Sequence, residues 1–274
     1  MRIHHLNCGT LRPPAGRLVD GKPGLFRRGE MVCHCLLIET DTELVLVETG
    51  LGSLATTRPV EWLGSLFVRG LRLPLSQEET ALHQVRQLGY DPADVRHIVL
   101  THLDLDHAGG LADFPDATVH VAERELDAMR NPRNRLERTR YRKAQFAHGP
   151  KFSSYTAHGE PWFGFDAVRD LVGLPPEILL VPLAGHTSGH SGVAVDTGEG
   201  WLLNAGDTYF FHGQVDPVNP RTTPGLGLFE RVMQTEAESR RHNLDRVRQL
   251  VRNHGDEVTV FCAHDAVELT RSLG

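Results

Sequence analysis

The stretch Thr101–Gly110, THLDLDHAGG, places His102, Asp104, Asp106 and His107 directly after an apolar run. Leucines separate the first three of these residues, so on an extended chain the polar side chains project together and the leucines project away. Imidazoles and carboxylates this dense, at the carboxyl end of a predicted strand, are typical of metal ligands. The alternative is a polar loop with a capping aspartate.

Three later apolar runs end in the same way. His186 follows ILLVP, Asp207 follows WLLN, and His264 follows VTVF. A strand end on a rigid scaffold can hold a ligand in a fixed position. Any one of these residues alone would more often be an ordinary loop residue. Together with Thr101–Gly110, they predict one metal site assembled from strand ends.

This pattern resembles the metallo-β-lactamase superfamily, whose αββα sandwich carries the motif His-x-His-x-Asp-His followed by distant His, Asp and His residues. The resemblance extends over residues 31 to 265. It implies an α/β protein with a four-layer αββα sandwich. We expect a single domain over residues 1–274, with inserted pocket or lid segments at 58–75 and 131–171. The motif is specific for the fold and not for the substrate.

The resemblance also assigns metal ligands. Two divalent ions are implied, with Asp207 bridging them because a carboxylate has an oxygen for each ion. The first ion is assigned to His102, Asp104 and His186, and the second to Asp106, His107 and His264. Glu48 stands where the family has the aspartate of an Asp-Thr-Gly turn, which orients ligands from behind.

Asp104 departs from the family motif, which commonly has His at this position. Two divalent ions (+4), three aspartates (−3) and a bridging hydroxide (−1) make the site formally neutral, whereas the His form would be +1. We therefore expect a less acidic bound water and weaker Lewis acids. Zn is the expected metal, and Mn or Fe become more competitive because carboxylate oxygen suits them. Flavodiiron proteins resemble this variant.

The resemblance implies hydrolysis by a metal-bound hydroxide that attacks a carbonyl or phosphoryl group. Asp106 is the candidate for proton transfer. Tyr209 is a second catalytic candidate, either binding the substrate oxygen or packing as an aromatic beside its neighbours. His190 and His212 either line the site or lie near it.

Three stretches of the sequence give less specific evidence about the site. The segment 131–171 is rich in aromatic residues and is either a satellite core or a lid, and it contains the pocket candidates His148 and His158. The basic run Arg130–Lys143 could contact phosphates or an acidic ligand, or form a solvated helix face. The segment 58–75 is irregular in pattern and is expected to line the pocket.

Local patterns predict the main elements. Two strands at 32–39 and 43–48 form a hairpin, and further strands are expected at 95–101, 118–121, 178–182, 192–195, 201–204 and 257–263. Helices are expected at 76–88, with Ser76 as the N-cap, at 123–129 and at 235–251. The two halves of the chain resemble one another in this rhythm.

Composition limits the expected partners and the expected cellular location of the protein. The 274 residues include 29 Lys and Arg against 35 Asp and Glu, a net charge of −6, and 16 histidines. This balance disfavours a nucleic-acid partner, and no apolar run of about 18 residues predicts a membrane span. Four cysteines and no recognisable secretory leader favour a cytoplasmic protein. The expected partner is a small-molecule substrate, and a homodimer is left open.

The favoured function is a lactonase or esterase acting on a small acyl substrate. The alternatives are a phosphodiesterase or thioesterase of the same superfamily, or a di-iron oxidoreductase that resembles flavodiiron proteins without the flavin domain. A non-catalytic metal-binding protein is disfavoured, because it would not need the complete ligand set.

Overall fold

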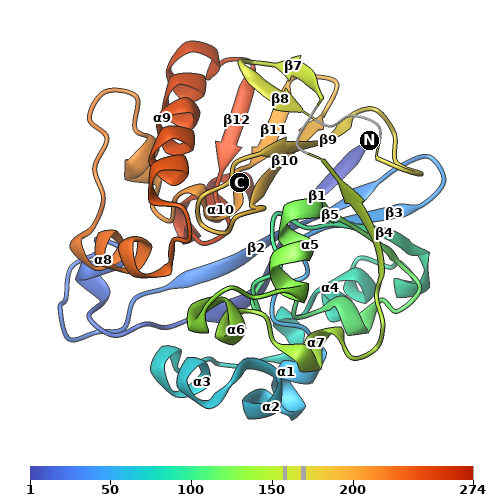
Figure 1. Ribbon diagram of the computed structural model, residues 1–274, viewed down its shortest axis with the longest axis horizontal. Helices are drawn as coiled ribbons and strands as arrows, with labels where there is room; N and C mark the ends of the chain where they lie inside the picture. Colours follow the sequence, from blue (N-terminus) through green and yellow to red (C-terminus); the bar gives the residue numbers. More distant parts are fainter. Residues whose placement is uncertain (157–158, 168–170, 274) are drawn as a thin grey trace.

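A six-stranded sheet forms the first half of the computed structural model, which describes residues 1–156, 159–167 and 171–273. Its strands follow chain order: β1 (Arg2–Leu11), β2 (Met31–Glu39), β3 (Leu44–Val47), β4 (Val95–Val99), β5 (Thr118–Ala122) and β6 (Lys151–Tyr155). The first three strands pair antiparallel and the last three add in parallel. The carboxyl ends of β3, β4 and β5 therefore lie at one edge of this sheet (Figure 1).

A four-stranded sheet forms the second half, in the order β12-β11-β10-β9. Its strands are β9 (Ile178–Pro182), β10 (Ser191–Asp196), β11 (Trp201–Asn204) and β12 (Val258–Phe261). β10 is antiparallel to β9 and β11, whereas β11 and β12 run parallel. A small hairpin of β7 (Glu160–Trp162) and β8 (Phe165–Ala167) lies beside β9.

Helices cover the outer faces of the two sheets and one end of the molecule (Figure 1). The helices of the first half are α1 (Ser53–Thr57), α2 (Pro59–Leu63), α3 (Ser65–Leu71), α4 (Ala81–Gln87), α5 (Glu123–Arg130), α6 (Arg135–Arg140) and α7 (Lys143–Phe146). Those of the second half are α8 (Pro224–Met233), α9 (Ala237–His254) and α10 (Ala266–Leu273). No described helix has the length and apolarity needed to cross a membrane.

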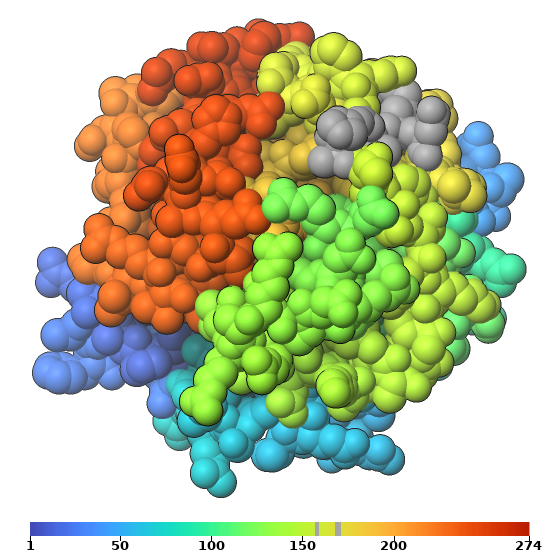
Figure 2. All heavy atoms as spheres, in the orientation of Figure 1, coloured from blue at the N-terminus to red at the C-terminus, as the bar shows by residue number. Residues whose placement is uncertain are grey.

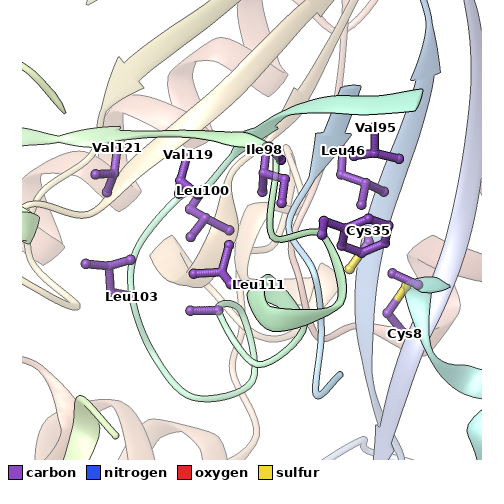
Figure 3. Packing of buried hydrophobic residues seen from close by; sticks show 14 of the residues in the cluster. Cys8, Cys35, Leu46, Val95, Ile98, Leu100, Leu103, Leu111, Val119 and Val121 are labelled. Carbon is purple, nitrogen blue, oxygen red and sulfur yellow. The ribbon is translucent and has the colours of Figure 1, made fainter. Parts of the chain in front are cut away.

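Alternating side chains explain the layers. Leu36 and Ile38 of β2 pack between the sheets against Leu180 and Val193 of the second half. The intervening Leu37 points to the outer side of the six-stranded sheet, where α4 and α5 cover it. Figure 3 shows this outer cluster, with residues of adjacent strands directed to one side. α9 covers the second sheet in the same way. The predicted αββα sandwich is confirmed.

Several elements differ from the sequence prediction. Residues 58–75 are helical over most of their length. α2 ends before Gly64, which has a φ of +86°, and α3 begins directly after it. The helix expected at 76–88 begins after Thr80, whose hydroxyl accepts the amide proton of His83, whereas Ser76 caps a separate 3-10 turn. β1, α8 and α10 were not predicted.

The aromatic residues of 131–171 belong mainly to the cores. Tyr141 is buried in the cluster under α5, and Trp162 and Phe165 are buried in the cluster under α9. The satellite-core alternative therefore describes these aromatics. Among the described residues of this segment, only Thr139, Arg140 and Arg142 line the large cavity described below. His158 falls outside the described residues.

Candidate metal centre

The predicted ligands converge from both sheets. His102, Asp104, Asp106 and His107 lie in the loop after β4, whereas His186, Asp207 and His264 follow β9, β11 and β12. A hydrogen bond from the amide of Ser191 to the carbonyl of Thr101 joins the two sheets beside these loops. Side chains that are as distant in the sequence as His102 and His264 therefore meet in one cluster.

Site one consists of His102, Asp104, His186 and Asp207, whose ligand atoms all lie within 4.8 Å of one another. The Oδ2 atom of Asp104 is 3.3 Å from Nε2 of His102 and 3.1 Å from Nε2 of His186. Oδ2 of Asp207 is 3.3 Å from the same His186 atom. Ligands bound tetrahedrally at 2.0–2.1 Å stand about 3.3 Å apart, so these spacings fit a zinc-sized ion. Nε2 of His102 is buried without a hydrogen-bond partner.

Site two lies on the other side of Asp207. The Oδ1 atom of Asp207 is 3.4 Å from Nε2 of His107 and 3.2 Å from Nε2 of His264, and these two nitrogens are 3.2 Å apart. Oδ2 of Asp106 is 3.8 Å from Nε2 of His264. Asp207 thus presents one oxygen to each site, which is the arrangement that a bridging carboxylate requires.

Glu48 holds the loop of site two from behind. Its carboxylate accepts the amide proton of Thr101 at 2.7 Å and the Nδ1 proton of His107 at 3.0 Å. The residue is buried and has a left-handed backbone, with φ +67°. Thr49 donates its hydroxyl to the carbonyl of His107. Because Glu48 holds Nδ1, Nε2 is the nitrogen of His107 that faces the site.

Further hydrogen bonds orient the ligands of the second half. His190 accepts the amide proton of Asp207 at 2.8 Å and donates to the carbonyl of Leu183, so it positions Asp207 and does not line the cavity. Nδ1 of His264 donates to the carbonyl of Val32 in β2 at 2.7 Å.

Glu125 of α5 ties together loops from both halves of the chain. One carboxylate oxygen accepts the amide proton of Leu103 at 3.0 Å, and the other accepts that of Gly189 at 3.2 Å. Gly189 packs so closely that a Cβ atom there would lie 2.1 Å from the backbone nitrogen of Glu125. The loops at 103 and 189 are therefore fixed to one helix.

Charge pairing dominates the electrostatics of the cluster. Burial would raise the pKa of Asp207, but His264 and His107 outweigh it and hold that pKa well below its usual range. Burial also opposes protonation of His107, yet Asp207 and Glu48 raise its pKa well above the usual value. The carboxylates and imidazoles stabilise one another as an ion-pair network.

Arg140 is part of this network, although the sequence did not single it out. It comes from α6, its side chain is 1% exposed, and Nη1 donates to Oδ2 of Asp104 at 2.6 Å and to Nε2 of His186 at 2.8 Å. Burial opposes the ionisation of Asp104, but the Arg140 guanidinium, together with His102 and His186, outweighs it, and the pKa of Asp104 lies well below the usual range. The neighbouring Arg135 and Arg138 are exposed. The basic run is thus a solvated face with one buried arginine directed into the site.

A cavity of about 720 Å³ opens onto the metal centre. Its floor includes Asp104, Asp106, Asp207, His186 and His264. Most of its wall is apolar and comes from the N-terminal segment, α3 and α8, and includes Leu11, Met31, Leu63, Phe67, Leu226 and Phe229. In Figure 2 the surfaces of the N-terminal segment (blue), α3 (cyan), α6 (green) and α8 (orange) meet at the lower left.

The other predicted residues lie away from this cavity. Tyr209 is fully buried in the core under α9, and its hydroxyl donates to Glu268 at 2.9 Å, so its position is that of a packed aromatic. Both the backbone amide and Nδ1 of His212 bond to the carboxylate of Asp265. His148 is exposed and does not line the cavity.

Comparison with known proteins agrees with this geometry. Residues 28–252 match the family described as Metallo-beta-lactamase superfamily. A probable metallo-hydrolase of Mycobacterium tuberculosis is 40% identical over 265 residues, covering 97% of this chain and 80% of that protein. An N-acyl homoserine lactonase of Bacillus thuringiensis is 27% identical over 164 residues, covering 60% of this chain and 58% of the lactonase.

Solved structures share the fold at lower identity. An N-acyl homoserine lactone hydrolase, with N-hexanoyl-L-homoserine bound at its catalytic metal centre, has a TM-score of 0.70 and 19% identity, covering 98% of this chain and 95% of that chain. The dizinc quorum-quenching lactonase AidC has a TM-score of 0.61 and 17% identity, covering 96% of this chain and 86% of that chain.

Proposed function

The chain belongs to the metallo-beta-lactamase superfamily, and we propose that it hydrolyses a small ester or lactone that carries an apolar acyl chain. It is a metal-dependent hydrolase with a binuclear site. The substrate class rests on the surroundings of that site, and the names of the lactonase relatives support it.

The apolar cavity carries this proposal. Its wall of leucine, methionine and phenylalanine side chains ends on the carboxylates and imidazoles of the metal centre. Each methylene buried against such a wall contributes about 0.8 kcal/mol. A substrate with a reactive acyl group at one end and an alkyl chain at the other would place the acyl group on the ligands and the chain against α3 and α8.

The residues of the site have separate roles in this reaction. Two divalent ions bound by the predicted ligands would supply an activated water near neutral pH and polarise the acyl carbonyl. Asp106 lines the cavity with a side chain that is 13% exposed, so it can pass a proton to the leaving oxygen. Glu48 and His190 keep His107 and Asp207 in place.

The metal preference follows from Asp104 and Arg140 together. Three aspartates contribute −3 and Arg140 contributes +1, so these side chains carry −3 + 1 = −2. A motif with His at position 104 and no arginine would also carry −2. We therefore propose zinc at both sites, and the oxygen of Asp104 keeps manganese and iron competitive. Metal analysis with activity measured under each ion tests this, and higher turnover with iron or manganese than with zinc would contradict it.

The substrate test compares N-acyl homoserine lactones of increasing chain length with an aryl phosphodiester and a glutathione thioester, each with the zinc-loaded protein. We expect lactone turnover, with kcat/KM at least about tenfold higher for a decanoyl than for a butanoyl chain. Phosphodiester or thioester turnover without lactone turnover would refute the proposal. Oxygen reduction by an iron-loaded protein would favour the di-iron alternative.

A matched pair of variants locates the acyl chain. Phe229 of α8 lines the cavity, whereas Val232 of the same helix is 61% exposed and does not. Phe229→Ala is expected to reduce the preference for the decanoyl chain, and Val232→Ala to leave it unchanged. Equal effects of the two substitutions would place the acyl chain elsewhere.

A further inference from the structure

The buried guanidinium of Arg140 occupies atoms that site one needs. Its Nη1 lies 2.6 Å from Oδ2 of Asp104 and 2.8 Å from Nε2 of His186, and its Nη2 donates to the carbonyl of Met233 in α8. These are the same Asp104 and His186 atoms that stand 3.1 Å apart in the site-one ligand set.

Nε2 of His186 can bind either Arg140 or a metal ion, but not both. A neutral imidazole has one nitrogen with a proton and one with a single lone pair. A guanidinium can only donate, so Nε2 of His186 accepts from Arg140 in the tautomer that carries its proton on Nδ1, and the Nε2 lone pair is then directed at the guanidinium. A metal ion needs the same lone pair, so the ion and the guanidinium cannot both bind His186.

Among the described residues, no arginine or lysine competes for site two in this way. Its atoms are Nε2 of His107, Nε2 of His264 and Oδ1 of Asp207. In the described part of the chain, no lysine or arginine makes a hydrogen bond or ion pair with these three atoms. The Nδ1 atoms of both histidines are already held, by Glu48 and by the carbonyl of Val32.

Arg140 has an alternative partner that it can bind when a metal ion occupies site one. Oδ1 of Asp104 and Nε of Arg140 are both buried without a hydrogen-bond partner. A small shift of the guanidinium can pair it with this second carboxylate oxygen, in the manner of arginine–carboxylate pairs. Oδ2 of Asp104 and Nε2 of His186 are then released to a metal ion.

We propose that Arg140 is an internal competitor for site one, so that the first metal ion enters site two and the second binds more weakly. This rests on the metal-binding part of the proposed function and is independent of the lactone chemistry. Arg140 thereby sets the difference in affinity between two sites that share Asp207.

The test is a zinc titration of the metal-free protein against a chromophoric chelator, with cobalt absorption as a second readout. We expect two steps of different affinity for the unsubstituted chain. In Arg140→Gln the second step should tighten by about tenfold, since one charge-assisted hydrogen bond no longer has to be broken. Arg138→Gln removes the same charge from the exposed face of α6 and is expected to change neither step.

Other outcomes overturn the proposal. A second step that stays unchanged or weakens in Arg140→Gln would mean that the guanidinium supports Asp104 as a ligand. If the Gln variant does not fold by circular dichroism, Arg140→Lys replaces it, because an ammonium cannot repeat the planar contact with both side chains. The second step should then tighten, and an unchanged step again refutes the competition. Absence of lactone turnover leaves this titration intact, whereas absence of any zinc binding removes both proposals.

Discussion

Glu48→Gln tests how strongly metal affinity depends on Glu48, which binds the predicted ligand His107 without facing the metal site itself. The substitution keeps the size of the side chain and removes its charge. Glutamine can still accept the amide proton of Thr101, now 2.7 Å from Oε1. Its amide nitrogen would then face Nδ1 of His107, which is 3.0 Å from Oε2, and two donors would oppose each other.

The expected magnitude follows from the one contact that is lost. A buried hydrogen bond to a charged group contributes about 1.5–3 kcal/mol. To avoid the clash, His107 must move its proton to Nε2, the atom directed at site two. Loss of a partner behind a metal-binding histidine typically weakens metal affinity by about 10–100-fold, which corresponds to about 1.4–2.8 kcal/mol. The two estimates agree.

The assay is zinc competition with a chelator, run beside urea unfolding of the metal-free protein. Glu48→Gln should weaken the tighter zinc step by about 10–100-fold. Glu78→Gln, an exposed change of equal charge, is the control. Zinc affinity of Glu48→Gln within about twofold of the unsubstituted chain would refute the view that Glu48 orients His107.

Three further predictions concern stability. Burial, together with neighbouring histidines, lowers the pKa of His34 and His120 to about 3 from 6.5. Both stay neutral in the fold while the unfolded chain takes up protons below pH 6.5, so the free energy of unfolding in urea should fall as the pH drops from 6.5 towards 3, and a flat profile would contradict this. Burial and Asp265 raise the pKa of Glu268 to about 7 from 4.5. Between pH 4.5 and about 7 the folded state keeps a proton on Glu268 that the unfolded chain has released, so the free energy of unfolding falls as the pH rises through this range. Glu268→Gln should therefore raise the melting temperature at pH 8 but not at pH 4. An equal gain at both pH values would contradict this reasoning. Gly189→Ala should cost about 1–3 kcal/mol in urea unfolding, because its Cβ would meet the backbone of α5; an unchanged midpoint would show that the helix can move away.

The strand ends could be predicted because their signal is local. Apolar runs followed by His or Asp identify β4, β9, β11 and β12, and the order of these runs was enough for the family and the fold class, both of which are confirmed. The structure brings the predicted ligands together, and their role in binding metal stays a prediction.

Arg140 could not be predicted because its burial is not a local property. Arg135 and Arg138 belong to the same short basic helix and are exposed, and no periodicity distinguishes the third arginine from them. Its position depends on the packing of α6 between Asp104 and the end of α8. Tyr209 shows the converse, since its nearness to Asp207 in sequence suggested a role that its hydrogen bond to Glu268 does not support.

The contacts between the last ligand loop and β2 have a consequence for how the molecule opens. The amides of Val32 and His34 donate to the carbonyls of His264 and Ala263, and His264 donates back to Val32. Separating the two halves at this point therefore dismantles site two in the same movement. A bound ion would slow hydrogen exchange at these amides together, as one cooperative unit, and would leave the distant edge strand β6 to exchange on its own. Metal bound at site two would therefore hold together two sheets that are built from different parts of the chain.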